Sequence, residues 1–170
     1  LRLESDAERV QIVTIHTAKG LEYPLVFCPF LWNGRLLGKH TDSARCHDEN
    51  GQPLLDLGSA QLEANLEAAR RETFAEKLRL TYVALTRAEH RLWLHWGPVA
   101  LPAIVKKTGK LVAEGLHSSS LAWLLHGREL PGDDALGELG NYLNEKAGET
   151  LAAELDQLAS DSGGQISRQP

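Results

Sequence analysis

A short polar loop behind an apolar run carries most of the side chains in this sequence that could do chemistry. Hydroxyls, backbone amides and a lysine suit a phosphate, and a carboxylate suits a sugar hydroxyl. The pattern GxxxxGK[ST] is absent and the lysine here precedes the glycine, so the loop is not a Walker A phosphate cradle. It therefore predicts only part of a nucleotide or nucleic-acid site. The residues concerned are Thr14, His16, Thr17, Lys19, Gly20 and Glu22.

A second candidate, Arg87, follows Thr86 at the end of a long predicted helix. Held there by Tyr82, Val83 and Leu85, its planar fork could be aimed at a phosphate on a neighbouring domain. An arginine finger of this kind accelerates phosphoryl transfer by about 10³–10⁵, because it neutralises charge in the transition state. The alternative is a structural ion pair.

The hydrophobic pattern predicts an α/β fold in which strands and a long helix position these residues. β-branched residues predict a strand over 9–15, and an apolar run bounded by prolines predicts a buried parallel strand over 24–30. Leucines and alanines at helical spacing predict a helix over 60–89. Alternation over 91–96 predicts a third strand, and 54–57 is a candidate edge strand. The expected sheet is thin and parallel, with the loop at the carboxyl end of its first strand.

The rest of the chain has weaker signals. Residues 32–59 are rich in glycine and turn residues and predict an excursion from the core. The serines at 118–120 could cap a short helix over 121–126. Residues 134–159 could hold one or two helices, interrupted by glycines, and 160–170 are expected to be disordered.

Composition excludes several classes of protein. The net charge of -5 provides no overall electrostatic footprint for nucleic acid, so DNA contacts must be local. Nine acidic residues and one basic residue lie between Glu129 and Asp161, so the acidity belongs to the tail. Two cysteines without CxxC spacing predict a reduced, cytoplasmic setting. No apolar run approaches the ~20 residues of a membrane span, which predicts no membrane partner. The lack of any methionine is what we expect of a piece of a longer protein.

Both polar segments resemble motifs of a known family. The signature TIHxAKGLEYPLVF over 14–27 is similar to motif V, and RLxYVALTRA over 79–88 to motif VI, of superfamily 1 helicases of the UvrD/Rep/RecB type. The apolar run that follows motif V and the long spacer before the helix favour the RecB group. UvrD-type proteins usually continue with a stretch rich in glycine and methionine, which is missing here. The resemblance is strong over 9–97 and weak over 98–130.

The resemblance implies a partial RecA-like sheet with flanking helices that lacks the Walker A half. Residues 1–130 would be the C-terminal part of the second motor domain, called 2A, with motif V at 13–24, motif VI at 79–88 and the excursion at 32–59. Residues 131–170 would be an acidic extension, weakly structured or helical. The parent would be part of an ATP-dependent 3′–5′ helicase/exonuclease that functions in double-strand-break repair and recombination.

The family also implies roles for the nucleotide-facing residues. Arg87 would reach the γ-phosphate of ATP with Mg²⁺, bound mainly by the preceding motor domain. Glu22 would hydrogen-bond the ribose, and Gly20 would let the backbone come close. Arg79 and Tyr82 would brace the helix that aims the finger. Alone, Glu22 could instead cap a helix.

Further roles concern DNA and partners. Thr14 and His16 would contact single-stranded DNA, and Lys19 would couple the DNA and nucleotide surfaces. The partners implied are single- and double-stranded DNA, the N-terminal motor domain of the same chain, and RecC-like and RecD-like subunits. On their own, His16 could be an ordinary loop histidine and Lys19 a solvated charge. Trp32 could lie near DNA.

Other interpretations stay open. The parent could be a UvrD-type repair helicase, or the chain could be a non-catalytic interaction domain derived from a helicase. Because the Walker motifs are absent, we expect the chain alone not to hydrolyse ATP. His40, Cys46 and His47 match no zinc spacing, so no metal site is predicted.

Overall fold

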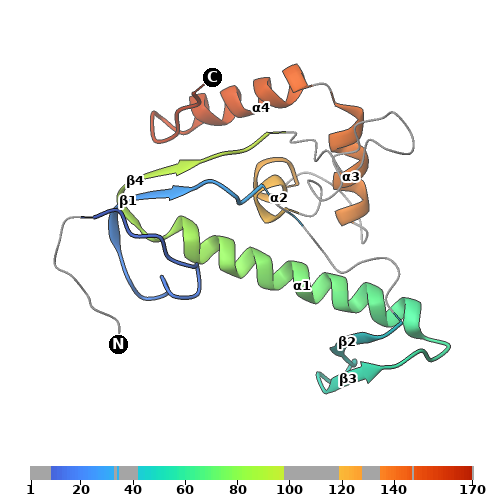
Figure 1. Cartoon of the computed structure of the whole chain (residues 1–170). Coiled ribbons are helices and arrows are strands. Elements are labelled where there is room, and N and C mark those ends of the chain that lie inside the picture. The colour runs from blue at the N-terminus through green and yellow to red at the C-terminus, as the bar shows by residue number, and fades with distance from the viewer. Residues whose placement is uncertain are drawn as a thin grey trace, which may run out of the picture.

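The computed structural model describes residues 9–32, 34, 42–97, 119–127, 135–146 and 148–169. Within them, two small sheets lie at opposite ends of one long helix, and three further helices follow (Figure 1). His40, Ser118 and the predicted loop after residue 97 lie outside the described residues. The elements are β1 (Tyr23–Cys28), β2 (Ala44–His47), β3 (Pro53–Asp56), α1 (Leu62–Leu85), β4 (Ala88–Leu94), α2 (Ser120–His126), α3 (Ala135–Glu145) and α4 (Gly148–Asp161).

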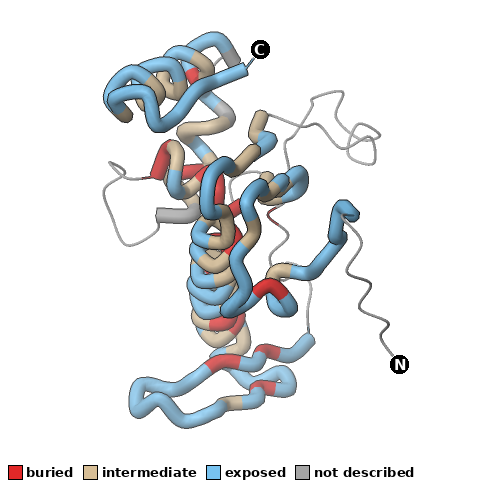
Figure 2. The backbone as a smooth tube through the Cα atoms, turned by 90° about the vertical axis from the view of Figure 1, so that its left-hand side faces the viewer, coloured by how far each residue is buried: buried red, intermediate tan, exposed pale blue. Residues whose placement is uncertain are grey.

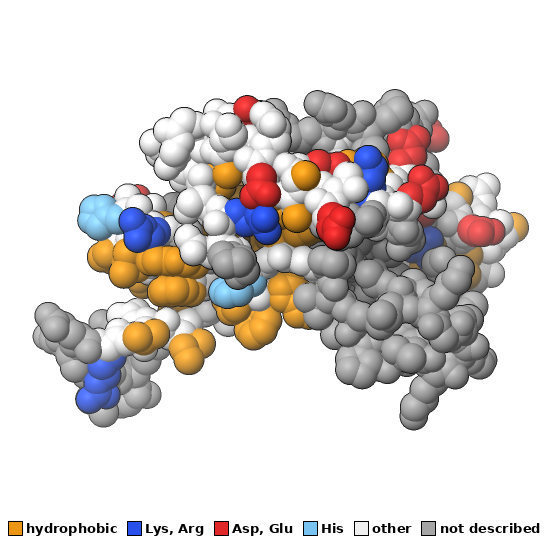
Figure 3. Space-filling model, turned by 90° about the horizontal axis from the view of Figure 1, so that it is seen from above, with side chains coloured by type: hydrophobic (Ala, Val, Ile, Leu, Met, Phe, Trp, Pro, Cys, Tyr) orange, Lys and Arg blue, Asp and Glu red, His pale blue; other side chains and the backbone are white. Residues whose placement is uncertain are grey.

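The sheet near the candidate site pairs β1 with β4 in parallel, as predicted for the strands over 24–30 and 91–96. Val26 pairs with Leu92, and Phe27 with Trp93. The rings of Phe27 and Trp93 stack with centroids 4.4 Å apart and an interplanar angle of 6°. The prediction of a fully buried β1 is wrong, because the side chain of Phe27 is 62% exposed. Figure 3 shows hydrophobic side chains gathered at this end of the molecule.

The long helix α1 confirms the helical spacing predicted over 60–89. Ala84, Phe74 and Leu66 are buried on one side of it. The helix ends at Thr86, whose backbone N–H still donates to the carbonyl of Tyr82. A parallel connection needs a crossover of this length, and α1 provides it between β1 and β4.

A two-stranded antiparallel hairpin, β2 and β3, packs on the N-terminal end of α1. The predicted edge strand at 54–57 is confirmed as β3, but β2 was not foreseen. Ala44 and Cys46 alternate inward against α1. The backbone N–H of His47 donates to Oε1 of Glu72 on the helix over 2.7 Å. The predicted excursion is therefore an ordered structure over 42–56.

The strand predicted over 9–15 is wrong. Residues 9–14 have no regular structure, and 15–20 form turns. The side chains of Val10 and Ile12 are 95% and 97% exposed. β-branched residues favour a strand only where a neighbouring strand and a core are present, and the described residues offer this segment neither.

The C-terminal region is helical and joined to the rest through polar contacts. Ser119 caps α2, because its Oγ accepts from the backbone N–H of Ala122 over 3.0 Å. α2 and α4 are joined by Nδ1 of His126 and Oε2 of Glu154, 2.7 Å apart. The glycines at 137 and 140 do not interrupt α3.

Disorder predicted over 160–170 is wrong as far as residue 169. Nε and Nη2 of Arg168 donate to the two carboxylate oxygens of Asp156 over 2.7 and 3.0 Å. This pair folds the last described residues back along α4. No helix in the described part of the chain is long and apolar enough to cross a membrane.

Buried residues concentrate where α1 passes α2, while the hairpin and the N-terminal segment are mainly exposed (Figure 2). Thr81 and Ser120 join their hydroxyls across this contact. Phe74 packs edge-on against Trp123, with centroids 5.8 Å apart. The core is therefore small and lies beside the C-terminal half of α1, which it holds in place.

Candidate nucleotide and nucleic-acid site

The loop that precedes β1 is a compact turn held by its own hydrogen bonds. The backbone N–H of Thr17 donates to Oγ1 of Thr14 over 3.2 Å, and the two hydroxyls lie 2.8 Å apart. The backbone N–H of Ala18 donates to the carbonyl of Thr14 over 3.0 Å. Ala18 is buried, and this anchors the turn. The structure thus gives the hydroxyl of Thr14 a capping role within the loop.

Gly20 ends this turn in the left-handed region, with φ +82°. An ideal Cβ placed on it would meet nothing within 4 Å. The glycine is therefore favoured by its backbone conformation, and the space beside it is open towards a ligand. From Gly20 the chain enters β1 through Leu21 and Glu22.

The side chain of Arg87 connects this loop to the end of α1. Its Nε donates to the carbonyl of Val83 over 2.9 Å, and its Nη1 donates to the carbonyl of Leu21, also over 2.9 Å. Its Nη2 donates to Oγ1 of Thr86 over 2.9 Å. Two segments 66 residues apart in sequence are thus joined by one guanidinium.

All three acceptors are neutral, and no ion pair of Arg87 occurs among the described residues. The structural ion pair that we considered for Arg87 is not found there. Of its five N–H groups, three are used by these acceptors, which leaves two with no acceptor in the described part of the chain. The half-buried guanidinium therefore keeps its charge available for an anion.

Glu22 lies between the two residues that bind Arg87. The carbonyl of Leu21 accepts from Nη1 of Arg87, and the backbone N–H of Tyr23 donates to the Arg87 carbonyl over 2.9 Å. Glu22 is exposed, and within the described residues its carboxylate has no ion pair with Arg87. Carboxylate and guanidinium therefore share one edge of the sheet without neutralising each other.

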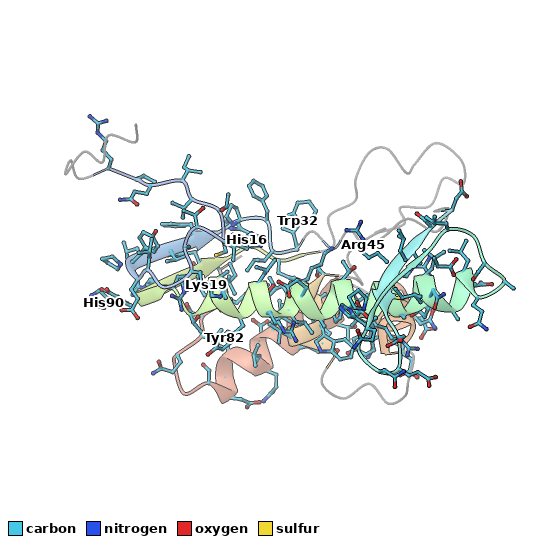
Figure 4. The ribbon with its side chains drawn as sticks, turned by 90° about the horizontal axis from the view of Figure 1, so that it is seen from below. His16, Lys19, Trp32, Arg45, Tyr82 and His90 are labelled. Carbon is cyan, nitrogen blue, oxygen red and sulfur yellow. The ribbon has the colours of Figure 1, made fainter. Side chains whose placement is uncertain are left out.

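His16 and Lys19 are exposed on the turn, beside the C-terminal end of α1 (Figure 4). The loop thus brings together all six residues named from its sequence, and Arg87 joins them from the other motif. Trp32 is half-buried and follows β1. His47 instead pairs with Glu72 at the far end of α1, 3.0 Å apart.

Bracing of the helix by Arg79 and Tyr82 side chains is not what the structure shows. Tyr82 is 68% exposed, and Nη1 of Arg79 pairs with Glu76 at the surface over 3.4 Å. Thr81, which lies between them along the helix, is the buried residue. Helical geometry turns neighbours in sequence to different sides, so the conspicuous residues of this motif face outward.

The described residues contain no group of three or more histidine, cysteine or acidic side chains arranged to hold a metal ion. The sequence did not reveal the three acceptors of Arg87. Two of them are backbone carbonyls, which carry no signal in residue type. Thr86 was visible beside Arg87, but its hydroxyl could have pointed elsewhere.

The pattern of loop and helix end agrees with a comparison against known protein families. The model of the UvrD-like helicase C-terminal domain matches residues 1–97. The chain belongs to this family. Its two-stranded parallel sheet with flanking helices is a partial RecA-like α/β fold.

Relatives of this UvrD-like chain include proteins of helicase–nuclease complexes. It is 43% identical over 126 residues to the RecBCD enzyme subunit RecB of Escherichia coli K12, a match that covers 74% of the chain and 10% of that protein. It is 44% identical over 104 residues to RecB of Haemophilus influenzae, covering 61% of the chain and 8% of the relative. It is 35% identical over 99 residues to an ATP-dependent helicase/nuclease subunit of Leuconostoc mesenteroides, covering 54% and 8%.

The chain therefore spans about a tenth of the length of the relatives that it matches. The resemblance to the UvrD/Rep/RecB helicases, and to the RecB group in particular, is confirmed at the level of the family.

Proposed function

We propose that this chain forms part of the second motor domain of a RecB-like, ATP-dependent 3′–5′ DNA helicase that acts in double-strand-break repair and recombination. Membership of the UvrD-like family and the identity to RecB subunits support this proposal. The partners would be DNA, the preceding motor domain of the same protein, and RecC-like and RecD-like subunits. The protein would be cytoplasmic.

The observation that carries the proposal is the unneutralised guanidinium of Arg87, held against the motif V loop by the Leu21 carbonyl. When ATP with Mg²⁺ is bound, it supplies the phosphoanhydride bond that is hydrolysed. Arg87 would direct its two remaining N–H groups to phosphate oxygens and stabilise the negative charge of the transition state. Its anchor to α1 through Val83 keeps the fork oriented.

Gly20 and Glu22 fit the sugar side of the same nucleotide. The open space beside Gly20 admits a ligand close to the backbone. The exposed Glu22 carboxylate can accept hydrogen bonds from ribose hydroxyls. Since Leu21 lies between them and binds Arg87, the ribose and phosphate contacts would come from one rigid segment.

Thr14, His16 and Lys19 would contact the phosphates of a single DNA strand. His16 and Lys19 are exposed, which leaves the imidazole and the ammonium accessible to an anionic backbone. Thr14 would contribute through the turn that it caps. Because this turn continues into Leu21, DNA bound here would act on the residue that holds Arg87.

The test is the substitution Arg87→Ala in the full-length protein that carries this chain. ATP turnover should fall by about 10³-fold or more, the lower end for an arginine finger, while nucleotide binding is largely kept. Arg71→Ala is the control, because Arg71 lies on the same helix with a 63% exposed side chain, paired only loosely with Glu67 at 3.7 Å. Unchanged turnover in Arg87→Ala would refute the finger and favour a non-catalytic interaction domain.

The isolated 170-residue chain provides a second test. Because it lacks a Walker A sequence, it should show no ATP hydrolysis above buffer in a phosphate-release assay. Robust hydrolysis that persists in Arg87→Ala would mean that the chain holds a different, complete site.

A further inference from the structure

The hydroxyl of Thr86 has a defined direction. It donates to the carbonyl of Tyr82 over 2.9 Å, with the carbonyl of Val83 also near at 3.3 Å. A hydroxyl has one proton, so its lone pairs must serve as acceptors elsewhere. Nη2 of Arg87 can only donate, and it lies 2.9 Å from this oxygen. Thr86 therefore relays a helix carbonyl to the guanidinium.

Thr86 is itself held firmly by the end of α1. Its backbone N–H donates to the carbonyl of Tyr82 over 3.1 Å, and the next N–H, that of Arg87, donates to Ala84 over 3.3 Å. Thr86 is thus the residue that closes the helix. Its side-chain oxygen moves with α1 and with nothing else in the described part of the chain.

A neutral acceptor at this place has a consequence for charge. A carboxylate in the position of the Thr86 hydroxyl would hold Arg87 by an ion pair and would neutralise it. The hydroxyl and the two carbonyls orient the same fork and leave its positive charge intact. The guanidinium can then pair with an anion without first breaking a salt bridge.

We infer that Thr86 is a positioning residue for the proposed phosphate contact of Arg87, which it aims through its hydroxyl without neutralising the charge. This inference rests on the proposed function. The group that Arg87 would meet is the terminal phosphate of a nucleoside triphosphate. Thr86 itself touches only Arg87 and the helix carbonyls among the described residues.

The first experiment compares Thr86→Val with Thr86→Ser in the full-length protein. Loss of one hydrogen bond donated by a charged group should reduce kcat by about 10- to 100-fold, with KM for ATP nearly unchanged. Serine restores the hydroxyl and should restore kcat. Thr73→Val is the matched control, since Thr73 makes the same bond to its helix, Oγ1 to the Ala69 carbonyl over 2.7 Å, without any contact to Arg87.

A second pair of variants tests the neutrality of the acceptor. Thr86→Asn and Thr86→Asp have side chains of similar size and differ in charge. If the charge of Arg87 must stay free, the Asp variant should turn over ATP at least about tenfold more slowly than the Asn variant, about 1.4 kcal/mol in barrier. Equal rates would overturn the inference. Both variants remain informative if Thr86→Val fails to fold.

The outcomes separate this inference from the proposed function. Loss of turnover in Arg87→Ala, together with wild-type kcat in Thr86→Val, would overturn the role of Thr86 and leave the finger intact. Unchanged turnover in Arg87→Ala would overturn the finger, and the role of Thr86 with it. An equal loss of kcat in Thr73→Val would show that the effect comes from the helix and would also overturn the inference.

Discussion

Tyr142→Phe should measurably destabilise the C-terminal helices, because it removes one bond from a polar cluster between them. The hydroxyl of Tyr142 on α3 donates to Oε1 of Glu154 on α4. The other carboxylate oxygen meets Nδ1 of His126 on α2, 2.7 Å away. The His126 side chain is 0% exposed and that of Glu154 is 31% exposed. One carboxylate thus joins three helices.

A hydrogen bond to a charged group contributes about 1.5–3 kcal/mol to stability. Water can reach the Glu154 carboxylate and replace part of the lost bond, so we expect about 1.5–2 kcal/mol for Tyr142→Phe. For a domain of 150–250 residues each kcal/mol shifts Tm by about 2–4 °C, which predicts a drop of about 3–8 °C. Thermal unfolding followed by circular dichroism measures it.

Tyr82→Phe is the control, because the 68% exposed Tyr82 makes no side-chain hydrogen bond among the described residues. Its effect should stay within about 0.5 kcal/mol. If Tyr142→Phe lowers Tm by no more than Tyr82→Phe does, the polar cluster contributes nothing to stability and the reasoning fails.

The same cluster predicts a dependence on pH. Burial raises the pKa of Glu154, but hydrogen bonds from Tyr142 and His126 outweigh burial and hold it below its ordinary value of 4.5. A lowered pKa stabilises the folded state above the ordinary value, and this contribution is lost as pH falls below it. Acid titration of Tyr142→Phe should therefore show a smaller loss of stability over this range than the wild type.

Three further changes test other parts of the fold. Hydrogen bonds from the backbone and side chains at the start of α1 lower the pKa of Asp56 from 3.8 to about 2, so its stabilisation should disappear as pH falls through that range, and Asp56→Asn should lack this part of the acid transition seen by circular dichroism. Gly20→Ala forces φ +82° on a residue with a Cβ and should cost about 1–2 kcal/mol in urea unfolding, whereas Gly97→Ala, also without atoms within 4 Å, should cost much less; equal costs would contradict the backbone argument. Leu121→Ala, at a side chain 2% exposed, should cost about 2–5 kcal/mol, and Leu124→Ala, at 40% exposed, less than half of that in the same assay.

The elements that the sequence predicted well are those with a local cause. The helical spacing of α1, the apolar run of β1 and the alternation of β4 each depend on neighbours in sequence. The serine cap of α2 is equally local, because the capping hydroxyl and the amide that donates to it are three residues apart. Family membership also followed from two contiguous signatures, and the comparison with known families confirmed it.

The predictions that were wrong depended on distant partners. Val10 and Ile12 suit a strand, yet no described strand lies beside them. β2 has a weak pattern of its own and is a strand because it pairs with β3 and packs on α1. The tail ending at residue 169 is ordered through the contact of Arg168 with Asp156, twelve residues earlier.

The candidate site shows the same division. Residue types and their order in the chain identified Arg87, Glu22 and the loop from Thr14 to Gly20, because chemistry and family signatures are written in side chains. Only the tertiary structure could show that Arg87 binds the carbonyl of Leu21, 66 residues earlier, and that its partners are all neutral. Backbone carbonyls are the same at every position, so their contribution appears only once the parallel sheet brings the two motifs to one edge.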